Sequence, residues 1–299
     1  MDTNNHQKKR KISLVLGSGG ARGLTHIGVI RWLEENDFEI NSISGCSIGA
    51  LVGGIYANGK LAEFEKWVCA ISKMDIVKFM DLSWQNNGLI KGDKIIQSLI
   101  DLVGNPNIEE LPIKFTAVAS DIDAEKEVWL SKGLLFDAIR ASISIPLFFT
   151  PYQINGVDLI DGGVLNPLPV APTFADGNEL IIAVDLVAPI DKTLHQPKEN
   201  ETKTDSGFSQ KIGQFITNIS KSPVEKAFNL TSYEIATQCI DSMQSVITRE
   251  KMASNPADYV VKIPRNISSI LDFHLADELI KFGYEQAEKT LGHLKLDKN

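Results

Sequence analysis

The residues with the clearest chemical potential form a Gly-x-Ser-x-Gly motif at residues 45–49, which occurs once in the chain. The motif lies between an expected strand and an expected helix, so Ser47 would occupy a tight strand-to-helix turn. Gly45 and Gly49 would leave room for that turn, and the start of the helix would favour negative charge near the hydroxyl. A purely structural turn would also accommodate these residues. We interpret Ser47 as a nucleophile because the strand-turn-helix context favours that role over a purely structural turn.

A glycine-rich segment at residues 17–23 lies between the first expected strand and the first expected helix. At such a junction, successive backbone N–H groups can converge on an anion. A dinucleotide-binding loop would need a glycine where Arg22 stands, and a P-loop would need a Gly-Lys-Ser/Thr sequence, which is absent. With a serine nucleophile nearby, an oxyanion hole explains the segment best, and each donor there lowers the barrier by about 3 kcal/mol.

A serine nucleophile needs a base, and histidine is the usual one. The five histidines are His6, His26, His195, His274 and His293. His26 falls one turn into the first expected helix, where a packing or capping role is expected. The others lie in the polar N-terminal tail, in a polar segment after residue 188 and in the C-terminal region, so none has the loop context of a catalytic base.

Two carboxylates are candidates for the base instead. Asp161 ends an expected strand and precedes Gly162 and Gly163, whose small size lets another loop approach closely. Asp176 is the rival, but Gly177 follows it, so an ordinary turn between a helix and a strand accounts for it. We therefore favour Asp161.

Strand and helix patterns alternate from Ile12 to Asp185, which predicts an α/β sheet. The expected strands are residues 12–16, 43–44, 115–119, 128–130 and 180–184, with a hairpin turn at Asn155-Gly156. The expected helices are residues 24–33, 51–57, 61–72, 95–103 and 134–142. Apolar residues gather between positions 74 and 92, and this segment would form either an acyl-binding cap or a packed helix and loop.

The same patterns divide the chain into four parts. We expect a flexible basic N-terminus at residues 1–11, a catalytic domain at 12–188, a linker or surface loop at 189–207, and a mostly helical region at 208–299. That last region has a break at Pro223, an expected strand at 259–263 and a final expected helix at 274–291.

Composition limits the classes of partner and location. The net charge is -8 and 43% of residues are hydrophobic, which favours a packed globular domain and excludes general attraction to nucleic acid. Cys46, Cys69 and Cys239 are too few and too scattered for a disulfide framework or a zinc site, so we expect three buried thiols and no metal. No segment has the roughly 18 apolar residues of a membrane span, and we expect a cytoplasmic protein.

Three segments, in order, carry a family resemblance: residues 19–23, residues 45–49, and Asp161 with its two following glycines. Together they resemble the patatin-like phospholipase family over residues 12–185. Residues 271–274 and 283–284 are further similar to bacterial members related to the neuropathy target esterase catalytic domain. Ser18 departs from the family, many of whose members have glycine there, but Gly19 and Gly20 remain and the loop path should be kept.

The resemblance implies a three-layer α/β/α sheet with a helical C-terminal extension. It implies a Ser47–Asp161 dyad, with an oxyanion hole formed by the amides of Gly19, Gly20 and Ala21 together with Arg22. The expected activity is that of a serine lipid acyl hydrolase: a phospholipase A, lysophospholipase or esterase without a cofactor. Its substrate would be a phospholipid or another fatty acyl ester, reached through transient contact with a membrane surface. Two alternatives stay open: an α/β-hydrolase-type esterase or thioesterase with a Ser-His-Asp triad, and a non-catalytic regulatory protein on the same fold.

Overall fold

The structure is a computed structural model that describes residues 9–72, 74–75, 92–146, 148–194 and 223–295. Its strands are β1 (Arg10–Leu16), β2 (Phe38–Cys46), β3 (Lys114–Asp121), β4 (Lys126–Leu130), β5 (Tyr152–Ile154), β6 (Val157–Asp161), β7 (Leu180–Ala188) and β8 (Tyr259–Pro264). Its helices are α1 (Thr25–Glu35), α2 (Ile48–Ala57), α3 (Leu61–Cys69), α5 (Asp93–Val103), α6 (Leu135–Ser142), α8 (Pro223–Ser254) and α9 (Ala276–Leu291). Short 3-10 turns are η1 (Gly20–Leu24), η2 (Ile108–Glu110), η3 (Gly162–Val164), η4 (Ala171–Asp176), η5 (Phe273–Leu275) and η6 (Gly292–Leu294).

One sheet contains all eight of these strands. Hydrogen-bonded neighbours run in the order β8, β7, β1, β2, β3, and every pair in that series is parallel. β3 also pairs with β4 and β6, and β6 pairs with β5, all antiparallel. The expected hairpin turn at Asn155-Gly156 is confirmed, since both residues have positive φ and join β5 to β6.

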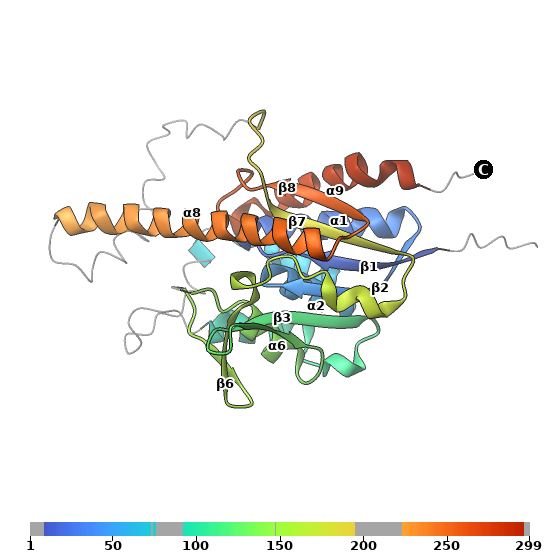
Figure 1. The fold of residues 1–299 in the computed structure, drawn as a ribbon, viewed down its shortest axis with the longest axis horizontal. Helices are drawn as coiled ribbons and strands as arrows, with labels where there is room; N and C mark the ends of the chain where they lie inside the picture. Colours follow the sequence, from blue (N-terminus) through green and yellow to red (C-terminus); the bar gives the residue numbers. More distant parts are fainter. Residues whose placement is uncertain (1–8, 73, 76–91, 147, 195–222, 296–299) are drawn as a thin grey trace, which may run out of the picture.

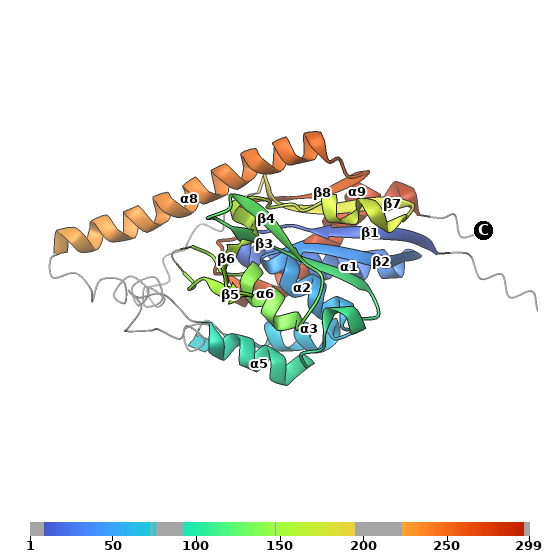
Figure 2. The ribbon, with the colours of Figure 1, turned by 60° about the horizontal axis from the view of Figure 1, so that its bottom comes forward.

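Helices cover both faces of the sheet, so the predicted three-layer α/β/α fold is confirmed. Figure 2 shows α8 on one face and α2, α3 and α5 on the other. The side chains of β1 point alternately into the two layers. Leu14 and Leu16 pack in the large hydrophobic core with α1, α2 and α9, whereas Val15 packs in a small cluster on the opposite face of the sheet. Successive strand residues point to opposite faces, which places apolar side chains in both layers.

The second strand is much longer than the two residues that its apolar pattern indicates. Polar Asn41 and Ser42 interrupt that pattern, but Ser42 is buried and its hydroxyl donates to Ser13 Oγ on the neighbouring β1, 2.9 Å away. Asn178 Nδ2 donates to both hydroxyl oxygens. Buried polar groups of this kind are tolerated when they bond to one another, and such pairing is invisible in a one-dimensional pattern.

The C-terminal region contributes to the sheet and to both helical layers. The expected strand is present as β8, which pairs with β7, so the sheet continues beyond residue 188. α9 packs on α1, while α8 begins at Pro223, contacts β7, and extends past the sheet at its N-terminal end (Figure 1). The helical C-terminal extension is thus confirmed.

Of four other expectations, one is wrong and three fall largely outside the described residues. Cys46 is buried as expected, but Cys69 is only partly buried and Cys239 is exposed, so the expectation of three buried thiols is wrong. The proposed acyl-binding cap at 74–92 lies almost wholly outside the described residues. The same holds for most of the expected linker at 189–207 and of the basic N-terminus at 1–11.

Candidate active site

Ser47 lies between β2 and α2 in a backbone conformation that is unusual for a side chain larger than glycine. Its φ is 55° and its ψ is -123°. The turn is tight because a Cβ at Gly45 would come within 2.5 Å of the Gly49 carbonyl oxygen, and one at Gly49 within 2.1 Å of the Leu16 carbonyl oxygen. Both glycines are therefore required by close backbone contacts, and the strained turn projects the Ser47 side chain away from the strand.

Pairing along β3 brings Ser47 and Asp161 together. β2 pairs with β3 up to Val118, and β6 pairs with the next residues, beginning with Ala119 opposite Asp161. β4 pairs with β3 alongside both, so β2 and β6 share the other edge of β3 and their carboxyl ends meet. As a result, the Ser47 hydroxyl donates to Asp161 Oδ2 across 2.5 Å.

Asp161 is enclosed, since it is only 2% exposed. Its Oδ1 accepts the Gly163 N–H at 2.7 Å, and its own N–H donates to the Ser144 carbonyl at 2.9 Å. Burial raises the pKa of the Asp161 carboxyl from 3.8 to about 7, and the hydrogen bonds from Ser47 and Gly163 oppose this rise. A carboxylate with such a pKa can accept and return a proton near neutral pH.

The two glycines after Asp161 permit this enclosure. A Cβ at Gly162 would come within 2.1 Å of the Val118 carbonyl oxygen, and one at Gly163 within 2.7 Å of the Ser18 hydroxyl. The segment after β6 therefore packs directly on β3 and on the glycine-rich loop, as the sequence indicates for small residues at this position.

Within the described structure, some backbone N–H groups of the glycine-rich loop have a hydrogen-bond acceptor and others do not. The Ser18 N–H donates to the Pro167 carbonyl at 2.8 Å, and the Ala21 N–H donates to the Ile270 carbonyl at 2.9 Å. For Gly19 and Gly20, no residue of the described chain accepts the N–H. The expectation that Ala21 supplies an oxyanion donor is thus corrected, because Ile270 already occupies its amide.

Arg22 supports the loop from within the protein. Its side chain is 1% exposed, and its Nε donates to the Gly19 carbonyl at 3.0 Å. Its two terminal nitrogens donate to the Arg265 carbonyl at 3.3 Å and to Asp241 on α8 at 2.8 Å. Since a trans peptide directs its C=O and its N–H to opposite sides, holding the Gly19 carbonyl also fixes the direction of the Gly20 N–H.

Two further residues at this site, Ser142 and Gln244, had no signal in the sequence. The Ser142 hydroxyl accepts the Ser47 N–H at 2.9 Å and donates to the Val118 carbonyl at 2.6 Å. Gln244 on α8 lies 3.5 Å from the Ser18 hydroxyl. These residues belong to segments without a motif, and only the packing of α6 and α8 brings them to the site.

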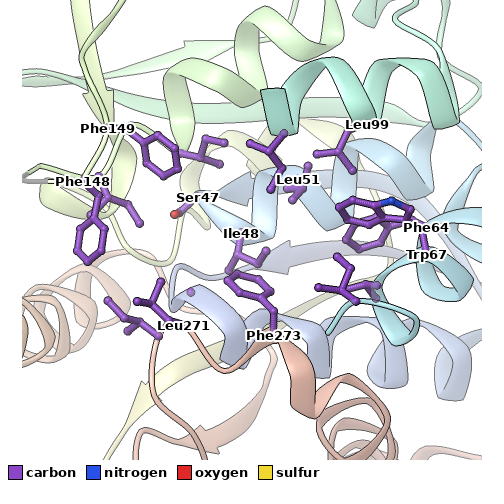
Figure 3. A pocket seen from close by; sticks show the side chains of 17 residues that line it. Ser47, Ile48, Leu51, Phe64, Trp67, Leu99, Phe148, Phe149, Leu271 and Phe273 are labelled. Carbon is purple, nitrogen blue, oxygen red and sulfur yellow. The ribbon is translucent and has the colours of Figure 1, made fainter. Parts of the chain in front are cut away.

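Two cavities in the described part of the chain meet at Ser47 and Asp161. The first has a volume of about 160 Å³, is lined by Ser47 and otherwise almost wholly by apolar side chains, and lies between α2, α3 and α5. Figure 3 shows Ser47 near Phe148 and Phe149 at one end, with Phe64 and Trp67 at the other. The second cavity, of about 300 Å³, is lined by Asp161, Arg22 and residues of α8.

The histidines and the rival carboxylate lie elsewhere or have other partners. His26 is fully buried, its Nε2 bonds the Gly17 carbonyl at 3.0 Å, and burial lowers its pKa to about 4. No histidine lines either cavity among the residues that are placed, which include His274 and His293 but neither His6 nor His195. Asp176 forms an ion pair with Lys114, the first residue of β3, and thus lies at the opposite end of the parallel strands from Ser47.

The described residues form neither a metal-binding cluster nor a membrane-spanning helix. Within the described ranges, no cluster of three or more His, Cys, Asp or Glu side chains could hold a metal ion. No helix in the placed part of the chain has the length and apolar character needed to cross a membrane.

Comparison with known proteins gives consistent matches. The family model described as patatin-like phospholipase matches residues 14–174. Uncharacterized NTE family proteins of Mycobacterium bovis and Mycobacterium tuberculosis are each 34% identical to this chain, with 96% of the chain and 93% of the relative covered. Lysophospholipase NTE1 of Kluyveromyces lactis is 28% identical over 95% of this chain, which spans only 19% of that protein. VipD from Legionella pneumophila has a similar structure, with a TM-score of 0.45 and 15% identity over 96% of this chain and 67% of VipD.

Proposed function

Since the chain belongs to the patatin-like phospholipase family, a family of lipid ester hydrolases, we propose that it hydrolyses fatty acyl esters with Ser47 as nucleophile and Asp161 as general base. One observation carries this proposal: the 2.5 Å hydrogen bond from the Ser47 hydroxyl to Asp161 Oδ2, at the junction of an apolar cavity and a more polar one. A serine is a weak nucleophile until a base takes its proton, and this contact has the geometry for that transfer.

The reaction follows from these positions. Ser47 Oγ attacks the ester carbonyl while its proton passes to Asp161 Oδ2, and the protonated carboxyl then returns the proton to the departing alcohol oxygen. Water next attacks the acyl-serine ester, Asp161 accepts a proton from this water, and the fatty acid leaves as Ser47 recovers its hydrogen. A pKa of about 7 suits both transfers, because Asp161 must be ionised to accept a proton and acidic enough to return it.

We assign the oxyanion hole to the N–H groups of Gly19 and Gly20. Neither N–H has an acceptor among the placed residues, and Arg22 holds the intervening peptide by its carbonyl. Two aligned backbone donors would stabilise the negative oxygen that develops as Ser47 attacks, and losing one such donor commonly lowers kcat about 10²–10³-fold. In this proposal Arg22 acts by positioning the loop.

The proposal is tested by labelling with a fluorophosphonate probe and by a panel of diacyl phospholipids, lysophospholipids and simple esters. The wild type is expected to be labelled and to release fatty acid, and Ser47→Ala to do neither. Ser44→Ala is a matched control, because Ser44 is another buried serine, lies on β2 just before Ser47, and has a hydroxyl without a partner in the described structure. Labelling that persists in Ser47→Ala would remove Ser47 as the nucleophile.

A triad enzyme is the competing possibility, and the histidines distinguish the two. His26→Ala, His195→Ala, His274→Ala and His293→Ala are each expected to keep most of the activity, because the dyad uses none of them as a base. A loss of about 10³-fold in one of these variants, with a normal melting profile, would favour the triad. A protein that is neither labelled nor active on any lipid would instead support the regulatory alternative.

A further inference from the structure

The two cavities at the site differ in which catalytic group they contain. Ser47 lines the first cavity and Asp161 the second. The cavities share a boundary, because four residues line both of them: Gly20, Ile145, Phe148 and Ile270. A bound ester whose carbonyl carbon lies at Ser47 can therefore extend one part into each cavity.

The proposed chemistry fixes the orientation of that ester. Asp161 returns its proton to the departing alcohol oxygen, so the alcohol part has to lie on the side of Asp161. The acyl part lies on the other side of the carbonyl carbon. We infer that the cavity between α2, α3 and α5 binds the fatty acyl chain and that the cavity beneath α8 binds the alcohol part. This inference rests on the proposed function.

The first cavity has the character expected of an acyl-chain site. Ile48 and Leu51 of α2 line it directly after Ser47, and Figure 3 shows Leu99 and Phe64 further from the hydroxyl. Phe64 and Leu99 are almost wholly buried, so they close the cavity on that side. An apolar cavity of about 150 Å³ binds small hydrocarbons without any polar contact. This one, of about 160 Å³, would hold the part of the acyl chain nearest the ester.

The second cavity has polar groups that the first lacks. Arg22, Asp241 and Gln244 line it together with apolar residues such as Met243 and Ile247. Arg22 and Asp241 neutralise each other as an ion pair, so their side of the cavity is polar without a net charge. These groups give the second cavity a few hydrogen-bonding positions for the oxygens of a glycerol-like alcohol, while most of its remaining lining is apolar.

The test uses two series of esters and two variants that add bulk. One series varies the acyl chain from two to sixteen carbons with p-nitrophenol as the alcohol, and the other keeps one acyl chain and varies the alcohol from methanol to glycerophosphocholine. In the wild type, each added methylene that fits the first cavity should raise kcat/KM about fourfold. Leu51→Trp should lower the ratio of long-chain to acetyl ester kcat/KM at least 100-fold, with little change across the alcohol series.

Met243→Trp should do the reverse: it should lower kcat/KM for large alcohols at least tenfold and keep the chain-length profile. Met243 is 57% exposed, so the added ring does not overpack the core. Val246→Trp is the matched control, because Val246 lies one turn further along α8, is 48% exposed and lines neither cavity. Val246→Trp should have the same kcat/KM profiles as the wild type across both the acyl-chain series and the alcohol series.

A second acyl-site variant covers the case in which Leu51→Trp does not fold. Leu99→Ala enlarges the closed end of the first cavity and should shift the preferred acyl chain to longer esters. The inference would be overturned if Leu51→Trp altered the alcohol series and Met243→Trp altered the acyl-chain series. It would also be overturned if Leu51→Trp or Leu99→Ala protein were active and kept the wild-type acyl-chain profile. A wild type without esterase activity or probe labelling would instead contradict the proposed function, so the two failures are distinguishable.

Discussion

Arg22 and Asp241 lie 219 positions apart in the chain and form an ion pair, with 2.8 Å between Nη2 and Oδ1. The pair joins the glycine-rich loop to α8. Because the same guanidinium holds the Gly19 carbonyl, the position of α8 and the direction of the loop amides are coupled through one buried side chain.

Arg22→Ala should lower kcat about 10²-fold or more with a small change in KM, because the loop loses the contact that directs its amides. The variant should also melt at a lower temperature, since three donated hydrogen bonds are lost. Arg22→Lys separates charge from geometry: a loss comparable to that of alanine would show that the guanidinium fork is required. Asp241→Asn, which keeps an acceptor, should lower stability by about 1–3 kcal/mol and affect kcat less. If Arg22→Ala changed KM alone and left kcat unaltered, Arg22 would be a substrate contact.

Asp161→Asn should lower kcat about 10²–10⁴-fold, because the amide keeps the shape of the carboxylate but cannot accept the Ser47 proton. Asp176→Asn is the control at the opposite end of the sheet, where only an ion pair with Lys114 is weakened, and it should retain activity. Steady-state kinetics and thermal melting on the same preparations test the pair. If Asp161→Asn stayed active with a normal melting temperature, Asp161 would be a turn residue and the dyad would be excluded.

Activity and stability should respond to pH in opposite directions. Activity should rise as pH increases through about 7, where the folded Asp161 carboxyl ionises and becomes a base. In the unfolded chain the same carboxyl ionises near pH 3.8, so between about pH 4 and 7 the folded protein holds a proton that the unfolded chain has lost. The stabilisation from that proton is complete below pH 4 and is lost as pH rises through 7.

Asp161→Asn isolates this effect from the other ionisable groups. The difference in melting temperature between Asp161→Asn and the wild type should grow from pH 4 to pH 7, in favour of the variant. Melting curves across this range measure the difference, and kcat/KM over the same range measures the ionisation in the active enzyme. A constant difference would mean that burial does not raise the pKa of Asp161.

Gly49→Ala should destabilise the protein by more than about 3 kcal/mol, because the added Cβ would overlap the Leu16 carbonyl, which belongs to the central strand and cannot move aside. Gly59→Ala is the matched comparison. Gly59 has a φ of 68° but no atom within 4 Å of an added Cβ, so this variant should cost only about 1 kcal/mol. Urea unfolding of both variants gives the two values, and similar costs would argue against a tight turn at Ser47.

The sequence by itself determined the features that depend on neighbouring residues. The nucleophile turn, the glycine-rich loop after the first strand and the hairpin at Asn155-Gly156 are local, because each is set by the space and dihedral angles that a few consecutive residues allow. Asp161 could be selected for the same reason, as a carboxylate at a strand end followed by two glycines. The full length of β2 could not be predicted from the sequence, because the polar Ser42 on it finds its hydrogen-bond partner on another strand.

Only the tertiary structure decided which of these groups are available for chemistry. Ile270 removes the Ala21 amide from the candidate donors, α8 supplies Asp241 to Arg22, and enclosure by neighbouring segments raises the pKa of Asp161. Each effect depends on atoms from segments far apart in the chain, whose distances no sequence pattern contains. Burial and hydrogen bonding act over a few ångströms, so they are fixed only once the sheet and both helical layers have packed.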